Sequence, residues 1–236
     1  MPQTQLVVER DSAGYTRFLL ARPERHNALD VAFTRALRDA FAHDPAAVVV
    51  LGSTDPRVFC AGADLTLADA DRARVSDLLY ECYEVMITRP GPVIAAVGGP
   101  AVGGGAQLAA AADLRIAGPA ARFRWTGPPG RDLAVGAWIL PDLVGRGVVM
   151  DLAMTGRWVD AAEALALGMV NRVEEDPLAA ADRLAADLAA QGTGSAARIK
   201  LITSAGGLLE RLHAEHRANS TAWDQAIAAA NPVSGL

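Results

Sequence analysis

A run of glycines between an apolar stretch and an alanine-rich stretch is the part of the chain best suited to chemistry. The β-branched run that begins at Pro92 stops at Gly98 and Gly99, and three more glycines, Gly103 to Gly105, precede the alanine-rich residues 106–112. This order predicts a strand, a tight turn and a buried helix. The glycines leave the unpaired N–H groups and the positive end of the helix dipole open to an anionic group. A turn of this kind could equally serve only to pack the helix against its strand.

The elements that would position this turn alternate between strands and helices. Two alternating runs around a turn at 11–14 predict a β-hairpin, and the continuous apolar run Val48–Leu51 predicts a strand buried on both faces. The expected elements are strands at 5–10, 15–20, 48–51, 92–97 and 113–117, and helices at 29–41, 68–88 and 104–112. Repeated β–α units of this length predict an α/β fold with a parallel or mixed sheet.

The second half of the chain has a different pattern. Residues 119–147 are rich in Gly, Pro, Arg and Trp, and we expect them to be irregular and either functional or in contact with another subunit. Helices are expected at 148–155, 160–167, 177–191, 196–203 and 208–230.

Charge and composition exclude several classes of function. The net charge is −5, and Lys200 is the only lysine among 22 basic residues, so nothing resembles a nucleic-acid-binding or anionic-membrane-binding surface. Cys60 and Cys82 lack metal-site spacing and the four histidines are scattered, so we expect no metal and no disulfide. The N-terminus lacks a signal peptide pattern and no apolar run is long enough to span a bilayer. We therefore expect a cytoplasmic protein.

Three segments, taken in order and with their spacing, identify a family. They are RPERHNAL at 22–29, FCAGADL at 59–65 and PVIAAVGGPAVGGGAQL at 92–108. The chain resembles the crotonase, or enoyl-CoA hydratase/isomerase, family over about residues 6–173. The resemblance implies a crotonase-like spiral of ββα units over residues 1–173 and a shortened helical trimerisation region over 174–236. It also implies a homotrimer or a dimer of trimers, an acyl-CoA thioester ligand, and no cofactor besides the coenzyme A of the substrate.

The resemblance also implies roles for individual residues. The backbone N–H groups of Ala63 and Gly104 would form an oxyanion hole for the thioester carbonyl. The first two motifs would hold the adenine and pantetheine parts of coenzyme A through Arg25, His26, Ala28, Ala61, Asp64 and Leu65. Asp64 could instead cap a helix, and Arg25 and His26 could be solvated loop residues.

The chain departs from the family pattern where a hydratase has its two glutamates. The first position is Gln107, whose amide cannot exchange a proton near neutral pH. As a candidate catalytic residue, Gln107 could orient a water or a carbonyl by hydrogen bonds, or it could only satisfy local backbone groups. No glutamate follows Phe123 in the second segment. Asp132 could act as a surrogate base or be an exposed loop charge. Trp125 could line the acyl pocket or only pack in the core.

Two hypotheses for the function follow from the resemblance. The first is an acyl-CoA-binding enzyme that stabilises a thioester enolate in an oxyanion hole, with weak or altered hydratase activity. The second is a non-catalytic acyl-CoA carrier. A dinucleotide-binding fold and a serine hydrolase are disfavoured, because the glycines do not fit GxGxxG and no GxSxG elbow is present.

Overall fold

The computed structural model describes residues 5–230 and contains two sheets. The larger sheet has the order β1-β2-β3-β4-β6-β9, with β1 antiparallel to β2 and every other pair parallel. Its strands are β1 Leu6–Arg10, β2 Tyr15–Leu20, β3 Val48–Ser53, β4 Val93–Val97, β6 Leu114–Ala117 and β9 Arg172–Val173. The smaller sheet, of order β5-β7-β8, is formed by β5 Ala101–Val102, β7 Arg122–Arg124 and β8 Val159–Asp160.

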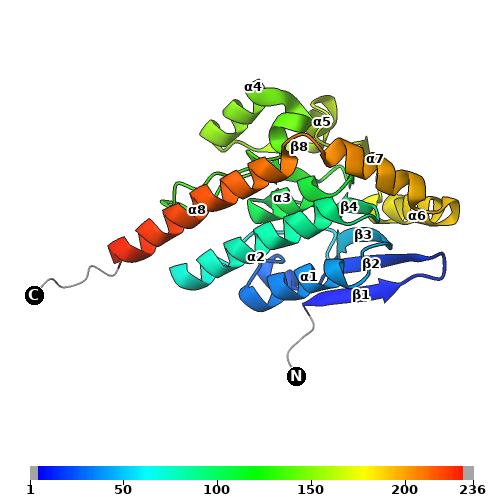
Figure 1. Ribbon diagram of the computed structural model, residues 1–236, viewed down its shortest axis with the longest axis horizontal. Coiled ribbons are helices and arrows are strands. Elements are labelled where there is room, and N and C mark those ends of the chain that lie inside the picture. The colour runs from blue at the N-terminus through cyan, green and yellow to red at the C-terminus, as the bar shows by residue number, and fades with distance from the viewer. Residues whose placement is uncertain (1–4, 231–236) are drawn as a thin grey trace, which may run out of the picture.

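Helices cover both faces of the larger sheet (Figure 1). They are α1 Val31–His43, α2 Asp69–Thr88, α3 Gly104–Ala111, α4 Leu140–Thr155, α5 Ala161–Ala166, α6 Pro177–Gln191, α7 Gly194–Ser204 and α8 Leu208–Ala230. The side chains of Val49 and Leu51 face a core that includes α1, α2 and α3, whereas Val48 and Val50 face α6. This alternation explains why β3 is a continuous apolar run. The predicted α/β architecture is confirmed.

Segment 119–147, expected to be irregular, contains two regular elements. It includes β7, and α4 begins at Leu140, eight residues before the predicted start. Gly145 interrupts α4 with φ 75° and ψ 155°, so two short helices follow one another across a kink. Pro141, Gly145 and Gly147 lie in the first half of α4. Proline and glycine both disfavour a helix interior, so the sequence did not indicate a helix there.

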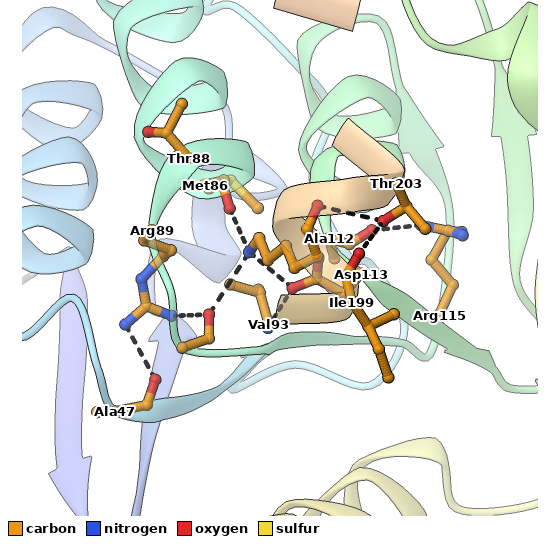
Figure 2. Close-up of polar contacts among 12 residues, drawn as sticks. Ala47, Met86, Thr88, Arg89, Val93, Ala112, Asp113, Arg115, Ile199 and Thr203 are labelled. Carbon is orange, nitrogen blue, oxygen red and sulfur yellow. Dashed lines mark hydrogen bonds and ion pairs between the residues drawn. The ribbon is translucent and has the colours of Figure 1, made fainter. Parts of the chain in front are cut away.

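The only lysine of the chain, Lys200, joins several elements of the fold. Figure 2 shows its partners Met86 and Asp113, together with Val93. Lys200 of α7 is buried, and its Nζ donates to the Met86 carbonyl at 2.6 Å and to Asp113 Oδ2 at 2.8 Å. Asp113 also accepts the Val93 N–H at 2.8 Å, which joins α7 and the end of α2 to the start of β4. Burial lowers the pKa of Lys200, and the charge of Asp113 opposes this effect. A ligand phosphate at another site would therefore have to be bound by arginines or backbone groups.

Helix α8 lies alongside α2, and both border the part of the molecule where the candidate site is found (Figure 1). No helix within residues 5–230 combines the length and the apolar character needed to cross a membrane. Over the same residues, no group of three or more His, Cys, Asp or Glu side chains could hold a metal ion.

Candidate functional site

Two backbone N–H groups from separate segments have no hydrogen-bond acceptor within residues 5–230. The segment 62–64 lies beside Leu29, where the Leu29 N–H donates to Gly62 O at 2.8 Å and the Asp64 N–H donates to Leu29 O at 2.9 Å. In this parallel bridge, Ala63 contributes no hydrogen bond through its N–H among residues 5–230. Gly104 is the first residue of α3, and its N–H is likewise unpaired in the described part of the chain. Both N–H groups remain available to a ligand.

Three glycines bring these donors together. Gly62 has φ +83°, and a Cβ atom there would lie 2.7 Å from Val102 O and 3.3 Å from the Gly104 nitrogen. Gly103 caps α3 with φ 53°, and its own N–H donates to Arg124 O at 2.9 Å. At Gly105 a Cβ would lie 2.3 Å from Cys60 O, so the first turn of α3 packs directly on the backbone of the 59–65 motif. Side chains at these positions would force the two segments apart.

Asn27 links the first motif to the second, a role that the sequence analysis missed. Its side chain is buried, accepts the Arg22 N–H at 2.8 Å, and donates to Ser53 Oγ at 2.8 Å and to Phe59 O at 2.9 Å. Its φ of 54° is in the left-handed region that Asn tolerates better than most residues. The sequence signal was available, because an Asn between His26 and Ala28 in a tight loop favours this conformation.

Trp138 fixes the orientation of Gln107. The indole Nε1–H donates to Gln107 Oε1 at 2.7 Å, and both residues are buried. An indole nitrogen only donates, so the oxygen of the amide must face Trp138. The Gln107 Nε2 atom has no hydrogen-bond partner among residues 5–230, and Gln107 lines the cavity described below. Gln107 is therefore positioned to offer N–H donors to a ligand.

A buried carboxylate that the sequence analysis did not identify lies behind the cavity wall. Glu215 of α8 accepts Tyr80 Oη–H at 2.8 Å, Gly136 N–H at 3.0 Å and Trp138 N–H at 2.9 Å. Asn219, one turn later, donates to Tyr80 Oη at 2.7 Å. Burial raises the pKa of Glu215, and its hydrogen bonds offset this only in part. Glu215 holds the segment that carries Trp138, and so positions the partner of Gln107.

The polar stripe on α8 was detectable in principle. Glu215 and Asn219 lie between Leu212 and Trp223 at helical spacing, which places two polar residues on a buried face. Buried polar residues require partners, so such a stripe indicates a hydrogen-bonded contact. The identity of the partners, about 80 or more residues earlier in the chain, depends on the tertiary structure.

These groups border one cavity of about 300 Å³. Its wall includes Ala63, Gly104 and Gln107, together with Tyr80 and Asn219. The polar side chains of the wall, as far as residues 5–230 show, are those of Arg72, Ser76, Tyr80, Tyr83, Gln107, Arg124, Thr126, Asn219 and Trp223. None of these carries a carboxylate or an imidazole. The described wall offers hydrogen-bond donors and two cations, and lacks a side chain suited to removing a proton near neutral pH.

Two of the residues expected to hold coenzyme A line the cavity, and the others lie outside its wall. Ala61 and Leu65 line the cavity, and Leu65 is 59% exposed. Arg25 and His26 are exposed in a 3-10 turn, and Ala28 follows them half-buried. The Ala61 N–H donates to His26 O at 3.0 Å, which holds this turn next to the cavity.

The Asp64 carboxylate accepts hydrogen bonds from a neighbouring residue of its own loop. Its carboxylate accepts the Thr66 N–H at 3.0 Å and the Thr66 hydroxyl at 2.7 Å, and Arg22 lies 3.2 Å away. Burial opposes ionisation, but these contacts outweigh it and lower the pKa of Asp64. Helix α2 begins at Asp69, after Ala68 as the N-cap, so Asp64 does not cap it.

The structure places Asp132 and Trp125 outside the cavity wall. Asp132 is exposed, with φ 41°. Trp125 is 2% exposed, packs against Gly136, and has no partner for its indole N–H among residues 5–230. The Nε of Arg124 donates to Gly156 O at 2.7 Å, and its guanidinium lies 5.7 Å from the centre of the Trp158 ring.

Comparisons with known proteins agree on the family of the chain. The family model described as enoyl-CoA hydratase/isomerase matches residues 11–231. A probable enoyl-CoA hydratase of Mycobacterium leprae is 37% identical over 209 residues, which cover 84% of this chain and 82% of the relative. A putative enoyl-CoA hydratase/isomerase of Bacillus subtilis is also 37% identical, over 188 residues that cover 73% of this chain and 71% of the relative.

Solved structures share the fold. A crystal structure of an enoyl-CoA hydratase/isomerase from Mycobacterium paratuberculosis superposes with a TM-score of 0.82 at 28% identity, and covers 94% of both chains. A crystal structure of an enoyl-CoA hydratase from Bacillus halodurans gives a TM-score of 0.83 over 94% of this chain and 96% of the other, at 22% identity. The family predicted from the three motifs is thus confirmed, and the chain belongs to the enoyl-CoA hydratase/isomerase family.

Proposed function

We propose that the protein binds acyl-CoA thioesters and stabilises an enolate-like thioester oxygen between the N–H groups of Ala63 and Gly104. The observation that carries this proposal is the convergence of two unpaired N–H donors from separate segments on one cavity. Attack on a thioester, or removal of its α-proton, moves negative charge to the carbonyl oxygen. Fixed donors in a site shielded from water stabilise such charge without reorganisation.

The cavity wall favours weak or altered hydratase activity. Addition of water across a double bond needs one group to take a proton from water and another to deliver a proton to the α-carbon. Gln107 can orient a water or a carbonyl but exchanges no proton, and the described wall lacks a carboxylate. Loss of each proton-transfer group costs on the order of 10²–10⁴-fold in rate.

The second candidate is a non-catalytic acyl-CoA carrier, which the absence of a carboxylate from the described wall also supports. Calorimetric titration with a set of saturated and unsaturated acyl-CoAs, followed by mass spectrometry of the products, distinguishes the enzyme from the carrier. Product formation over many equivalents supports the enzyme, and tight binding without product supports the carrier. Binding of no acyl-CoA would refute both, and crotonyl-CoA hydration at the rate of a competent hydratase would refute weak activity.

Asp132→Asn tests the surrogate base directly. Because Asp132 is exposed and outside the cavity wall, we expect turnover of any accepted substrate to stay unchanged. A loss of turnover without a loss of binding would place Asp132 in the mechanism. The homotrimer or dimer of trimers stays a prediction, which light scattering of the purified protein tests.

A further inference from the structure

One end of the cavity contains two buried N–H groups that have no acceptor. Arg72 of α2 and Trp223 of α8 both line the cavity, and the Arg72 guanidinium carbon lies 5.7 Å from the centre of the Trp223 ring. Arg72 Nε and Trp223 Nε1 are buried, and neither has a hydrogen-bond partner within residues 5–230. Buried donors without acceptors are rare and costly, so a ligand that brings an acceptor is favoured at this end.

The charges at the same place favour an anionic acceptor. Asp69 forms ion pairs with Arg72, through Nη2, and with Arg131, whose Nη2 lies 2.7 Å from Asp69 Oδ2. Two guanidinium groups thus share one carboxylate, which leaves one positive charge in excess. The described cavity wall contributes no acidic side chain to balance it. The planar guanidinium group can bind a carboxylate through two parallel N–H···O hydrogen bonds.

The position of Arg72 on α2 separates this end of the cavity from the oxyanion donors. Leu79 lies next to Gly104, because a Cβ on Gly104 would be 2.7 Å from Leu79 Cδ1. Arg72 precedes Leu79 by seven residues, or about 10 Å along the helix axis. Ser76 lines the cavity between them. A ligand with its thioester at Gly104 would therefore reach Arg72 only with the far end of a medium-length acyl chain.

We propose that this cavity accepts acyl thioesters whose acyl chain ends in a carboxylate, bound at that carboxylate by Arg72 and Trp223. This substrate class rests on the proposed function, because the thioester must lie at Ala63 and Gly104. The carboxylate accepts from the guanidinium and from the indole N–H, and its charge balances the excess positive charge beside Asp69.

Matched ligands test the proposal by calorimetry. Adipyl-CoA is compared with hexanoyl-CoA, and suberyl-CoA with octanoyl-CoA, so that each pair differs only at the far end of the chain. The wild-type protein should bind the better-fitting dicarboxylic ligand about 10- to 100-fold more tightly than its neutral partner, as expected for a charge-assisted hydrogen bond. The same ligands as pantetheine thioesters, which lack the coenzyme A phosphates, should show the same preference.

Arg72→Gln should abolish this preference and change the affinity for hexanoyl- and octanoyl-CoA less than about threefold. Arg74→Gln is the matched control, because Arg74 is on the same helix, is 47% exposed and is absent from the cavity wall. It should keep the preference. Trp223→Phe retains an aromatic ring and removes the N–H donor, and should reduce the preference a few-fold even if the Arg72 variant is too unstable to measure.

The outcomes separate this proposal from the proposed function. Equal or tighter binding of the neutral ligands to the wild-type protein would overturn the carboxylate site and leave acyl-CoA binding intact. Equal weakening of both coenzyme A ligand classes by Arg72→Gln, with no effect of this substitution on the binding of the pantetheine thioesters, would assign Arg72 to the coenzyme A phosphates and also overturn the carboxylate site. Binding of none of the thioesters would refute both proposals.

Discussion

Gly62→Ala is the change that most directly tests whether two backbone donors form the site. A Cβ at position 62 would lie 2.7 Å from Val102 O and 3.3 Å from the Gly104 nitrogen. The first distance is below any normal contact, and both neighbours are backbone atoms, so no side-chain rotation can relieve it. Either the 61–63 segment or the start of α3 must move. In both cases the N–H groups of Ala63 and Gly104 no longer converge.

The expected loss of function exceeds the loss of stability. The φ of +83° at Gly62 is left-handed, and alanine there costs about 1–2 kcal/mol before the contact with Val102 is counted. Removal of one oxyanion donor costs about 3–4 kcal/mol of transition-state stabilisation, or roughly 10²–10³-fold in rate. Gly62→Ala should therefore remain folded at low temperature and lose most of the stabilisation of negative charge on the thioester oxygen.

The absorbance of a conjugated enoyl-CoA measures this effect even without turnover. Two donors on the thioester carbonyl polarise the conjugated system and should shift its absorbance to longer wavelength on binding, and the shift should shrink in Gly62→Ala. Gly147→Ala is the control, since a Cβ there meets nothing within 4 Å and Gly147 has no left-handed φ. It should keep the shift and gain about 0.5–1 kcal/mol of stability from helix propensity. A wild-type shift and wild-type turnover in Gly62→Ala would refute the two-donor site.

Three further predictions concern buried ionisable groups. Lys200→Met leaves Asp113 without its cation and should lower the free energy of unfolding in urea by about 3 kcal/mol, where a change below about 1 kcal/mol would contradict the structural role of the pair. Burial raises the pKa of the Cys60 thiol to about 12, so iodoacetamide at pH 8 should modify it only after unfolding, and rapid labelling of the native protein would contradict its burial. Glu215 has a folded-state pKa above its unfolded value of 4.5, so its contribution to stability is most favourable below pH 4.5 and falls as the pH rises through that value toward the folded pKa. The stability of the wild type minus that of Glu215→Gln should therefore decrease from pH 4 to pH 7, and a difference that rises would refute the raised pKa.

Helix α6 and the first hairpin, which are set by local signals, were predicted to within one residue. Helix α6 spans 177–191 as expected, because Pro177 occupies its first position and Asp176 accepts the Ala179 N–H at 2.9 Å as an N-cap. The hairpin of β1 and β2 follows from alternation around a turn. These features depend on residues a few positions apart, so the local sequence contains the interactions that determine them.

Features set by contacts between distant segments were not predicted. Glu215 is 79 residues from Gly136 and 135 residues from Tyr80, so the helical spacing on α8 can indicate a buried face but not these partners. Lys200 likewise lies among exposed residues of α7, while its amine reaches a carbonyl 114 residues earlier. Only the folded chain reveals that these charged groups are buried and paired.

The orientation of Gln107 decides what chemistry the cavity can support. A glutamate at this position would face Trp138 with one oxygen and offer the other as a base. The amide places its only oxygen against the indole at 2.7 Å and leaves N–H donors for the ligand. In the proposed site, Ala63, Gly104 and Gln107 would all donate to oxygen atoms of the ligand, which suits an enolate already formed. Under the proposed function we therefore expect turnover of ligands that generate their own negative charge, for example by losing carbon dioxide, or turnover by a nucleophile that enters with solvent.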